Sequence, residues 1–231
     1  MPTPDTGLFR FSKPKHVRDA DIRAATAAIN VAVVEDDERL RQALVFQLDT
    51  AGFQVAPHSS AEEFLEVSHA NVFDCIVVDN LLPGMNGLQL QQILKRTVPY
   101  ASIVFITGHG GLALGMHAMR QGAVDFLEKP IDDEALLASI RRGANLSRKQ
   151  HAEQTQRIEL EKRQSTLTPR EREVFLLITT GLLNKQAGVV LGATERTVKA
   201  HRAQVMNKMH AGSFADLVRM AGILQISPLT L

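Results

Sequence analysis

The stretch CIVVDNLLPGMNG, residues 75–87, decides how the first half of the chain is expected to fold. Its apolar start, CIVV, is typical of a strand that is buried on both faces. An acid, Asp79, follows at once, and Pro83, Gly84 and Gly87 come next. Asp with nearby Pro and Gly is also common turn chemistry. The stretch alone therefore leaves two interpretations of Asp79 open, a turn residue and a functional carboxylate.

Apolar runs alternate with amphipathic segments on both sides of this stretch, from Asn30 to about residue 140. We expect strands at 31–34, 53–56, 74–78, 102–107 and 123–127, and helices at 39–51, 61–69, 88–97, 112–121 and from 132 into the 140s. Such alternation predicts an α/β domain with a parallel sheet and helices on both faces. The flavodoxin-like strand order 2-1-3-4-5 would place strands 1 and 3 side by side where the order reverses.

Polar side chains follow four of the five expected strands. Glu35 and Asp36 follow the first, Asp79 follows the third, Thr107 ends the fourth, and Lys129 comes after the fifth. Functional groups in such sheets gather outside the carboxyl ends of the strands, so we expect these side chains to meet. Three close acids repel one another unless a cation joins them, and an all-oxygen cluster suits Mg²⁺. With the metal present, Asp79 can act as a nucleophile that forms an aspartyl phosphate, while Thr107 and Lys129 bind the phosphoryl oxygens.

These motifs resemble the receiver domain of two-component response regulators. The resemblance rests on four segments, VVEDD (33–37), VVDNLLPGMNG (77–87), ITGHG (106–110) and AVDFLEKP (123–130). It implies that Asp36 is a direct Mg²⁺ ligand, that Glu35 acts mainly through water, and that the backbone carbonyl of Leu81 completes the protein ligands. It also implies that Asp79 both accepts the phosphoryl group and binds the metal.

The resemblance further implies an aromatic switch. Phe126 occupies the position whose ring moves inward when the Thr107 side chain turns toward phosphate. Asp37 is a surplus acid that we expect to be solvated. Leu81 has an apolar side chain that cannot orient a hydrolytic water, which favours a long-lived phosphoryl group, whereas His109 could counter this effect.

The net charge of +1 hides an asymmetry along the chain. Residues 30–140 hold 6 Lys and Arg against 15 Asp and Glu, a net charge of −9, whereas residues 141–231 hold 15 against 7, a net charge of +8. A basic C-terminal part suggests a polyanionic partner. Two ordinary solvated surfaces of opposite sign are the alternative.

The C-terminal part is predicted to be helical. Residues 141–165 are polar with sparse apolar positions, which favours a long solvated helix over a coiled coil. Thr168 to Glu171, TPRE, is a capping box with proline at the first helical position, and we expect Gly181 to stop that helix. A short helix at 184–191, a turn at Gly192 and a basic helix from Thr194 to about residue 210 then form a helix-turn-helix candidate.

This part resembles the DNA-binding domain of the LuxR/NarL class. The resemblance rests on LTPREREV (167–174), GLLNKQ (181–186) and TVKAHR (197–202), and with the receiver it points to the FixJ/StyR-like branch of the NarL/FixJ response regulators. It implies that base edges are faced by Lys199, Ala200 and Ala203, and phosphates by Lys185, Thr194, Arg196 and Arg202. Ala203 occupies a place where some relatives carry a polar base-contacting residue, and Gly188 stands where they usually have alanine in the second helix. These two departures blur the expected sequence preference.

The predicted organisation is a flexible extension (1–29), a receiver (30–140), a helical linker (141–165) and a helix-turn-helix domain (166–231). The function expected from the resemblance is a transcription regulator whose receiver catalyses only its own phosphotransfer and dephosphorylation. Its expected partners are a sensor histidine kinase, double-stranded promoter DNA, RNA polymerase and, on phosphorylation, a second copy of the chain. A single cysteine, Cys75, fits the cytoplasm, and no segment is apolar and long enough for a membrane span. The alternative is a phosphorylation-independent DNA-binding regulator whose receiver serves for dimerisation or partner binding.

Overall fold

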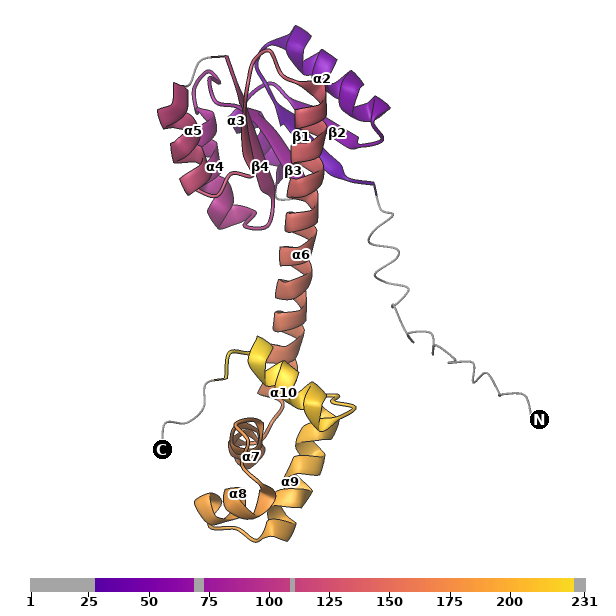
Figure 1. Cartoon of the computed structure of the whole chain (residues 1–231), viewed down its shortest axis with the longest axis vertical. Helices are drawn as coiled ribbons and strands as arrows, with labels where there is room; N and C mark the ends of the chain where they lie inside the picture. The colour runs from indigo at the N-terminus through magenta and orange to yellow at the C-terminus, as the bar shows by residue number, and fades with distance from the viewer. Residues whose placement is uncertain (1–27, 69–72, 109–110, 227–231) are drawn as a thin grey trace, which may run out of the picture. The chain divides into compact units, whose positions relative to one another are not determined.

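The computed structural model describes residues 28–68, 73–108 and 111–226, and it divides into two compact units, Met1–Ser147 and Arg148–Leu231. Figure 1 shows the elements of each unit. The predicted extension lies outside the described residues except for its last two positions, and so does His109.

The first unit contains a five-stranded parallel sheet of order β2-β1-β3-β4-β5, so the predicted order 2-1-3-4-5 is confirmed. The strands are β1 (Asn30–Val34), β2 (Gln54–His58), β3 (Cys75–Asp79), β4 (Ser102–Thr107) and β5 (Asp125–Glu128). Every residue of β3 and β4 is buried, as expected for central strands of a sheet covered on both faces. The second strand begins one residue later than predicted and the fifth two residues later.

Five helices accompany the sheet: α2 (Glu38–Thr50), α3 (Ala61–Ser68), α4 (Gly87–Thr97), α5 (Gly111–Arg120) and α6 (Asp133–Ser165). One hydrophobic core contains residues of α3, α4 and α5, among them Phe64, Leu90 and Ala118. The other contains residues of α2 and the start of α6, among them Leu48 and Ile140. Each core includes side chains from alternate positions of the same strands, so helices cover both faces of the sheet.

A glycine starts α4 because the chain passes very close to the end of β3. A Cβ at Gly87 would lie 2.7 Å from the backbone oxygen of Asp79. Asn86 then caps the helix in a capping box with Gln89. The absence of a side chain at Gly87 therefore lets the start of α4 pass close to the backbone at the end of β3.

The second unit is all-α. It contains the end of α6 followed by α7 (Pro169–Thr179), α8 (Asn184–Leu191), α9 (Glu195–Lys208) and α10 (Phe214–Ile223). The Thr168 capping box is present, and Gly181 has a φ of 101° just after α7 ends. Val198 and Val205 of α9, and Met209 directly after this helix, are all fully buried.

Two features of this unit differ from the sequence analysis. The fourth helix, α10, was not predicted, although Ser213 caps it and Leu217 and Ala221 are buried at helical spacing. The segment 141–165 is helical as predicted, but Leu160 is only 3% exposed and belongs to the core of the second unit. The large apolar residues of this segment, Leu146, Ile158 and Leu160, are too sparse to give a helical period that would reveal this packing.

Within the part of the chain that the structure describes, no helix combines the length and the apolar character that crossing a bilayer requires.

Candidate functional site

The predicted groups meet at the carboxyl edge of the sheet. In the parallel register, Val34 pairs with Val78, Asp79 with Ile106, and Thr107 with Glu128. Glu35 and Asp36 directly follow β1, and Lys129 directly follows β5. The end of each of these strands therefore presents its polar residue at the same edge of the sheet.

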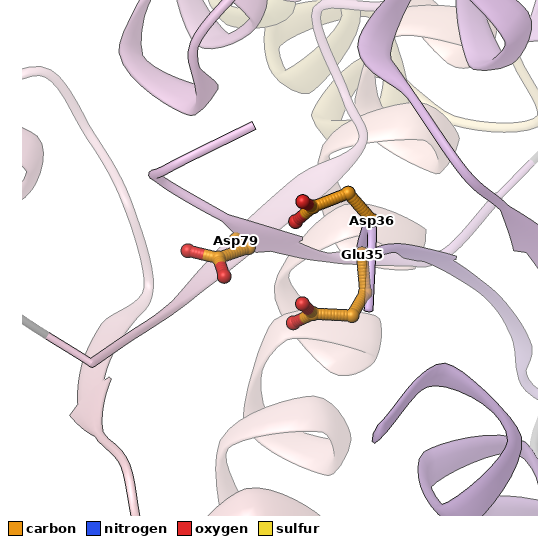
Figure 2. Close-up of side chains that lie close together, drawn as sticks. All are labelled: Glu35, Asp36 and Asp79. Atoms are coloured by element: carbon orange, nitrogen blue, oxygen red, sulfur yellow. The ribbon is translucent and has the colours of Figure 1, made fainter. Parts of the chain in front are cut away.

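Three of these residues form an acid cluster. Carboxylate oxygens of Glu35, Asp36 and Asp79 lie within 4.8 Å of one another. Figure 2 shows the cluster, with the first two acids on one chain segment and Asp79 on its neighbour. Glu35 is 1% exposed and Asp79 is 5% exposed, whereas Asp36 is exposed. Two of the three acids are therefore shielded from water, and Asp36 forms the open side of the cluster.

One ammonium group lies between the two buried acids. Lys129 Nζ donates to Asp79 Oδ2 at 2.6 Å and to Glu35 Oε2 at 2.8 Å. Burial alone would lower the pKa of Lys129, but its hydrogen bonds to the two carboxylates outweigh burial and raise it. Burial raises the pKa of Glu35, and Asp79 adds to this shift, while the hydrogen bond from Lys129 opposes it. One ammonium group thus compensates two buried carboxylates.

This donor set fits Mg²⁺. All the side-chain groups that would face the ion are carboxylate oxygens, which Mg²⁺ prefers, and Asp36 accepts no hydrogen bond at its carboxylate within the described residues. Burial first, and then the charge of Asp79, raise the pKa of Glu35, and a cation beside the two carboxylates would oppose both effects. The cluster therefore has both the chemistry and the charge for a divalent hard cation.

Asp37 and Leu81 lie next to the acid cluster in the sequence, but their side chains are not part of it. Asp37 is exposed, and its side chain caps α2 by accepting from the amides of Arg39 at 2.8 Å and Leu40 at 3.1 Å. This cap explains the surplus acid without a metal. Leu81 is 54% exposed, and its amide donates to Asp79 Oδ1 at 2.8 Å, which orients the Asp79 carboxylate.

Thr107 and Phe126 lie on neighbouring strands. Thr107 is fully buried, and its carbonyl accepts from the amide of Lys129 at 2.8 Å. Phe126 is half-buried, with its ring centroid 6.4 Å from that of Phe105. The ring also lies beside Gly115 of α5, where a Cβ would lie only 3.1 Å from the Phe126 ring. The absence of a side chain at Gly115 therefore makes room for the ring in its observed position.

Sequence reasoning did not single out Arg41. Its Nη1 donates to the backbone oxygens of Glu35 at 2.6 Å and Asp36 at 3.2 Å. The one signal in the sequence is that Arg41 lies in the first turn of the helix predicted after the acids. A side chain at such a position points back toward the start of the helix.

The second unit presents most of the predicted DNA-binding side chains on its surface. Exposed positions comprise Lys185, Thr194, Arg196, Lys199, Ala200 and Ala203. Thr194 also caps α9 by accepting from the amide of Thr197 at 3.1 Å. Lys199 Nζ lies 2.9 Å from Glu195 Oε1, so its ammonium is paired within the helix.

Arg202 is half-buried. Its Nη1 lies 3.4 Å from Asn184 Oδ1, and its guanidinium lies 4.5 Å from the centroid of the Phe214 ring. This cation–π contact fixes the side chain against α10, the helix that was not predicted. The predicted phosphate contact of Arg202 would therefore come from a side chain that is already held in place.

The glycine at position 188 has a packing cause. A Cβ there would lie 2.7 Å from the backbone oxygen of Ala193, in the turn between α8 and α9. Gly192 closes that turn in the left-handed region, with a φ of 60°. The turn thus passes closer to α8 at this point than a side chain would allow.

The cysteine and the histidines are not part of a metal-binding cluster within the described residues. The Cys75 thiol is fully buried, and burial raises its pKa to about 12. His117 is exposed. Within residues 28–68, 73–108 and 111–226, the acid cluster at the sheet edge is the one group of three or more potential metal ligands.

Comparison with known proteins agrees with both units. Residues 31–141 match the family described as response regulator receiver domain, and residues 165–221 match bacterial regulatory proteins, luxR family. The chain is 39% identical to the transcriptional regulatory protein FixJ of Azorhizobium caulinodans, over 87% of this chain and 95% of that protein. It is 43% identical to nodulation protein W of Bradyrhizobium diazoefficiens, over 88% of this chain and 89% of that protein.

Solved structures give the same picture. The response regulator StyR matches with a TM-score of 0.72 and 38% identity, over 85% of this chain and 99% of that chain. Full-length FixJ from B. japonicum matches with a TM-score of 0.54 and 35% identity, over 87% and 100% of the two chains.

Proposed function

Because the chain belongs to the response regulators that join a receiver domain to a LuxR-type DNA-binding domain, we propose that phosphorylation of Asp79 by a sensor histidine kinase switches its binding to promoter DNA. The observation that carries this proposal is the acid cluster beside Lys129 at the carboxyl edge of the sheet. The reaction would take place in the cytoplasm and depend on Mg²⁺.

The chemistry would use Asp79 as the nucleophile. A carboxylate oxygen attacks phosphorus, the new O–P bond forms, and the bond from phosphorus to the donor, a kinase imidazole nitrogen or the oxygen of a small acyl phosphate, breaks. Glu35, Asp36, Asp79 and the Leu81 carbonyl would hold Mg²⁺, which when bound neutralises charge on the phosphoryl oxygens. The receiver would thus catalyse only its own phosphorylation and dephosphorylation.

Lys129 and Thr107 would stabilise the product. Lys129 already donates to Asp79 Oδ2 at 2.6 Å, so it can transfer a hydrogen bond to a phosphoryl oxygen attached there. Thr107, at the end of the next strand, would donate its hydroxyl to another oxygen. The apolar, exposed Leu81 side chain cannot position a water for hydrolysis, which favours a long phosphoryl lifetime.

The switch would connect this chemistry to assembly. When Thr107 turns toward the phosphoryl group, Phe126 gains room to turn inward, and the surface formed by residues 112–140 changes shape. We propose that this surface pairs two receivers. A two-fold dimer would present two copies of α9 about 34 Å apart to a palindromic site.

The DNA contacts would come mainly from α9. Lys199, Ala200 and Ala203 would face base edges, while Lys185, Thr194, Arg196 and Arg202 would lie near phosphates. Lys199 must first leave Glu195, which is 2.9 Å away, so its contact with DNA replaces an existing ion pair. RNA polymerase would be the protein partner of the regulator once it is bound to DNA.

Substitution at the phosphoacceptor tests the proposal directly. Asp79→Asn keeps the side-chain volume but cannot form an acyl phosphate, and Asp49→Asn, an exposed acid of α2, is the matched control. Both variants and wild type are incubated with acetyl phosphate and Mg²⁺, and incorporation is measured by phosphate-affinity electrophoresis. We expect incorporation in wild type and Asp49→Asn only. Equal incorporation in Asp79→Asn would refute the assignment.

The same samples test the link to DNA. Selection of bound fragments from genomic DNA identifies a target, and its affinity is then compared with and without acetyl phosphate. We expect phosphorylation to tighten binding for wild type and to leave Asp79→Asn unchanged. Wild-type affinity that does not respond to phosphorylation would favour the receiver as a phosphorylation-independent dimerisation module.

A further inference from the structure

The turn that carries Glu35 and Asp36 is held at nearly every backbone position. The Glu35 amide donates to the His58 carbonyl at 3.1 Å. The Asp37 amide donates to Glu35 Oε1 at 3.3 Å, and the Asp37 carbonyl accepts from the Arg41 amide at 2.9 Å. The turn is therefore bonded to β2 on one side and to α2 on the other.

The two carbonyls of the acid pair itself are held by one side chain. Arg41 Nη1 donates to Glu35 O at 2.6 Å and to Asp36 O at 3.2 Å. Arg41 lies on α2, only five residues after Asp36, and its guanidinium closes a short loop over the turn. Two consecutive carbonyls pointing at one donor fix the peptide planes on both sides of the Asp36 Cα.

Asp36 depends on this arrangement more than its neighbours do. The Glu35 side chain accepts from Lys129 and from the Asp37 amide, and the Asp79 side chain accepts from Lys129 and from the Leu81 amide. Within the described residues, the carboxylate of Asp36 accepts no hydrogen bond. No hydrogen bond to the carboxylate therefore holds it in place, and the backbone that carries Asp36 is the part of this residue that the structure shows to be fixed.

We infer that Arg41 is a positioning residue, which holds the Asp36 carboxylate toward Asp79 through the backbone and so prepares the cation site. This inference rests on the proposed function, because it takes the acid cluster as the Mg²⁺ site. It concerns a residue that would touch neither the ion nor the phosphoryl group.

Charge and geometry make opposite predictions for this residue. A guanidinium near a cation site repels the cation, so removing Arg41 should tighten binding if charge alone matters. Removing a group that orients a ligand weakens binding, typically by about 10–100-fold for outer groups at metal sites. The sign of the change therefore decides between the two roles.

The test measures metal affinity in the full-length, metal-stripped protein. Mn²⁺, a spin-active substitute for Mg²⁺, is titrated into the protein, and the amplitude of the free Mn²⁺ electron paramagnetic resonance signal gives the dissociation constant. Competition with Mg²⁺ then gives the constant for that ion. We expect Arg41→Met to raise both constants about tenfold or more.

Two further variants make the result specific. Arg39→Met removes the same charge from an exposed position of the same helix and should leave the constants unchanged or slightly lower. Arg41→Lys retains a donor nitrogen and should recover part of the affinity lost in Arg41→Met. The Arg41→Lys variant also supports the measurement if Arg41→Met does not fold, which circular dichroism in EDTA would reveal.

Phosphorylation by acetyl phosphate supplies a second readout. A positioning role predicts that the Mg²⁺ concentration for half-maximal rate rises in Arg41→Met, while the rate at saturating Mg²⁺ approaches that of wild type. Equal or tighter metal binding in folded Arg41→Met, with wild type binding normally, overturns this inference and leaves the proposed function intact. A wild-type protein that binds neither ion overturns the proposed function itself.

Discussion

Replacing Lys129 by methionine should destabilise the first unit strongly when no divalent cation is present. The Lys129 ammonium bridges two carboxylates whose side chains are only 1% and 7% exposed, those of Glu35 and Asp79. Methionine preserves the aliphatic stem and removes the charge. Two buried negative charges then remain with no cation between them.

The magnitude follows from the burial of the two acids. Removing one partner of a buried ion pair costs about 3–5 kcal/mol, because it leaves an uncompensated buried charge. The Lys129 side chain is 22% exposed, so water can reach the site and partly replace the ammonium. We therefore expect a loss of about 3 kcal/mol in the free energy of unfolding at neutral pH, the lower end of that range.

The loss should depend on pH in a definite direction. The folded-state pKa of Glu35 is raised above its ordinary value of 4.5, so the folded state binds the extra proton and stability falls as pH rises through this window. Lys129 opposes that shift through its hydrogen bond and charge, and methionine removes this opposition. The deficit of Lys129→Met should be small near pH 4.5 and grow toward neutral pH.

Mg²⁺ should reverse much of the deficit. The ion would compensate the same two carboxylates. In Lys129→Met the ion would not have to compete with an ammonium group for Asp79 Oδ2 and Glu35 Oε2. A ligand that binds only the folded state stabilises it by about 2.7 kcal/mol at one hundred times its dissociation constant. Mg²⁺ should therefore stabilise Lys129→Met more than it stabilises wild type.

The assay is urea denaturation of the full chain, with hydrogen exchange in peptides of β3 reporting on the first unit alone. Lys95→Met is the matched control, because Lys95 is exposed and donates to Gln121 Oε1. A change within about 0.5 kcal/mol is expected there. If Lys129→Met is as stable as the control in EDTA, or if its deficit grows on acidification, the assignment of surplus buried charge is wrong.

Three other substitutions test particular contacts. Gly188→Ala should destabilise the second unit by about 1–3 kcal/mol, because its Cβ would meet a backbone oxygen at 2.7 Å. Gly222→Ala, where a Cβ would meet no atom within 4 Å, should stabilise the unit by about 0.5–1 kcal/mol. Thermal melting of the two variants measures both changes. Gly115→Ala places a Cβ 3.1 Å from the observed ring of Phe126, so it should displace the ring from this position. Under the proposed switch, the displaced ring should raise the dimer fraction without phosphate, as measured by analytical ultracentrifugation. An unchanged dimer fraction would show that the ring position does not control dimerisation. If the Lys199 ammonium contacts a phosphate, Lys199→Ala should flatten the slope of log affinity against log salt by about 0.9. If Lys199 contacts a base, the variant should relax base preference by about 1–3 kcal/mol. An unchanged salt slope together with unchanged base preference would exclude Lys199 from the interface.

The sequence predicted the sheet and its acids because both follow from local patterns. The apolar runs around Val31 and Val77 show where the buried strands lie, and parallel strands place their carboxyl ends at one edge whatever the details of packing. The meeting of Glu35, Asp36 and Asp79 could therefore be foreseen from three separate segments.

Contacts that depend on a single side chain or a single missing one could not be predicted in this way. Arg41 looks like any polar residue on a helix, because its bonds to two carbonyls depend on the shape of the preceding turn. Gly115 and Gly188 read as weak helix positions, and only the neighbouring ring and carbonyl explain them. The fourth helix of the second unit, α10, was missed although it carries an ordinary serine cap at Ser213.

The same surplus of charge connects the stability of the first unit with its proposed chemistry. If Glu35 and Asp79 each had its own cation, only Asp36 would remain uncompensated, and the resting site would attract Mg²⁺ less strongly. With one ammonium for two buried acids and Asp36 open beside them, the site is already short of positive charge. Sharing also leaves Lys129 bonded to both acids, so that it can leave Asp79 for a phosphoryl oxygen without losing its bond to Glu35. A chain optimised only for stability would neutralise Glu35, and Glu35→Gln should accordingly be at least as stable as wild type in EDTA while binding Mg²⁺ more weakly. Urea denaturation and the Mn²⁺ titration measure the two effects separately, and a variant that loses stability in EDTA would show that Glu35 is held for structure and not for charge.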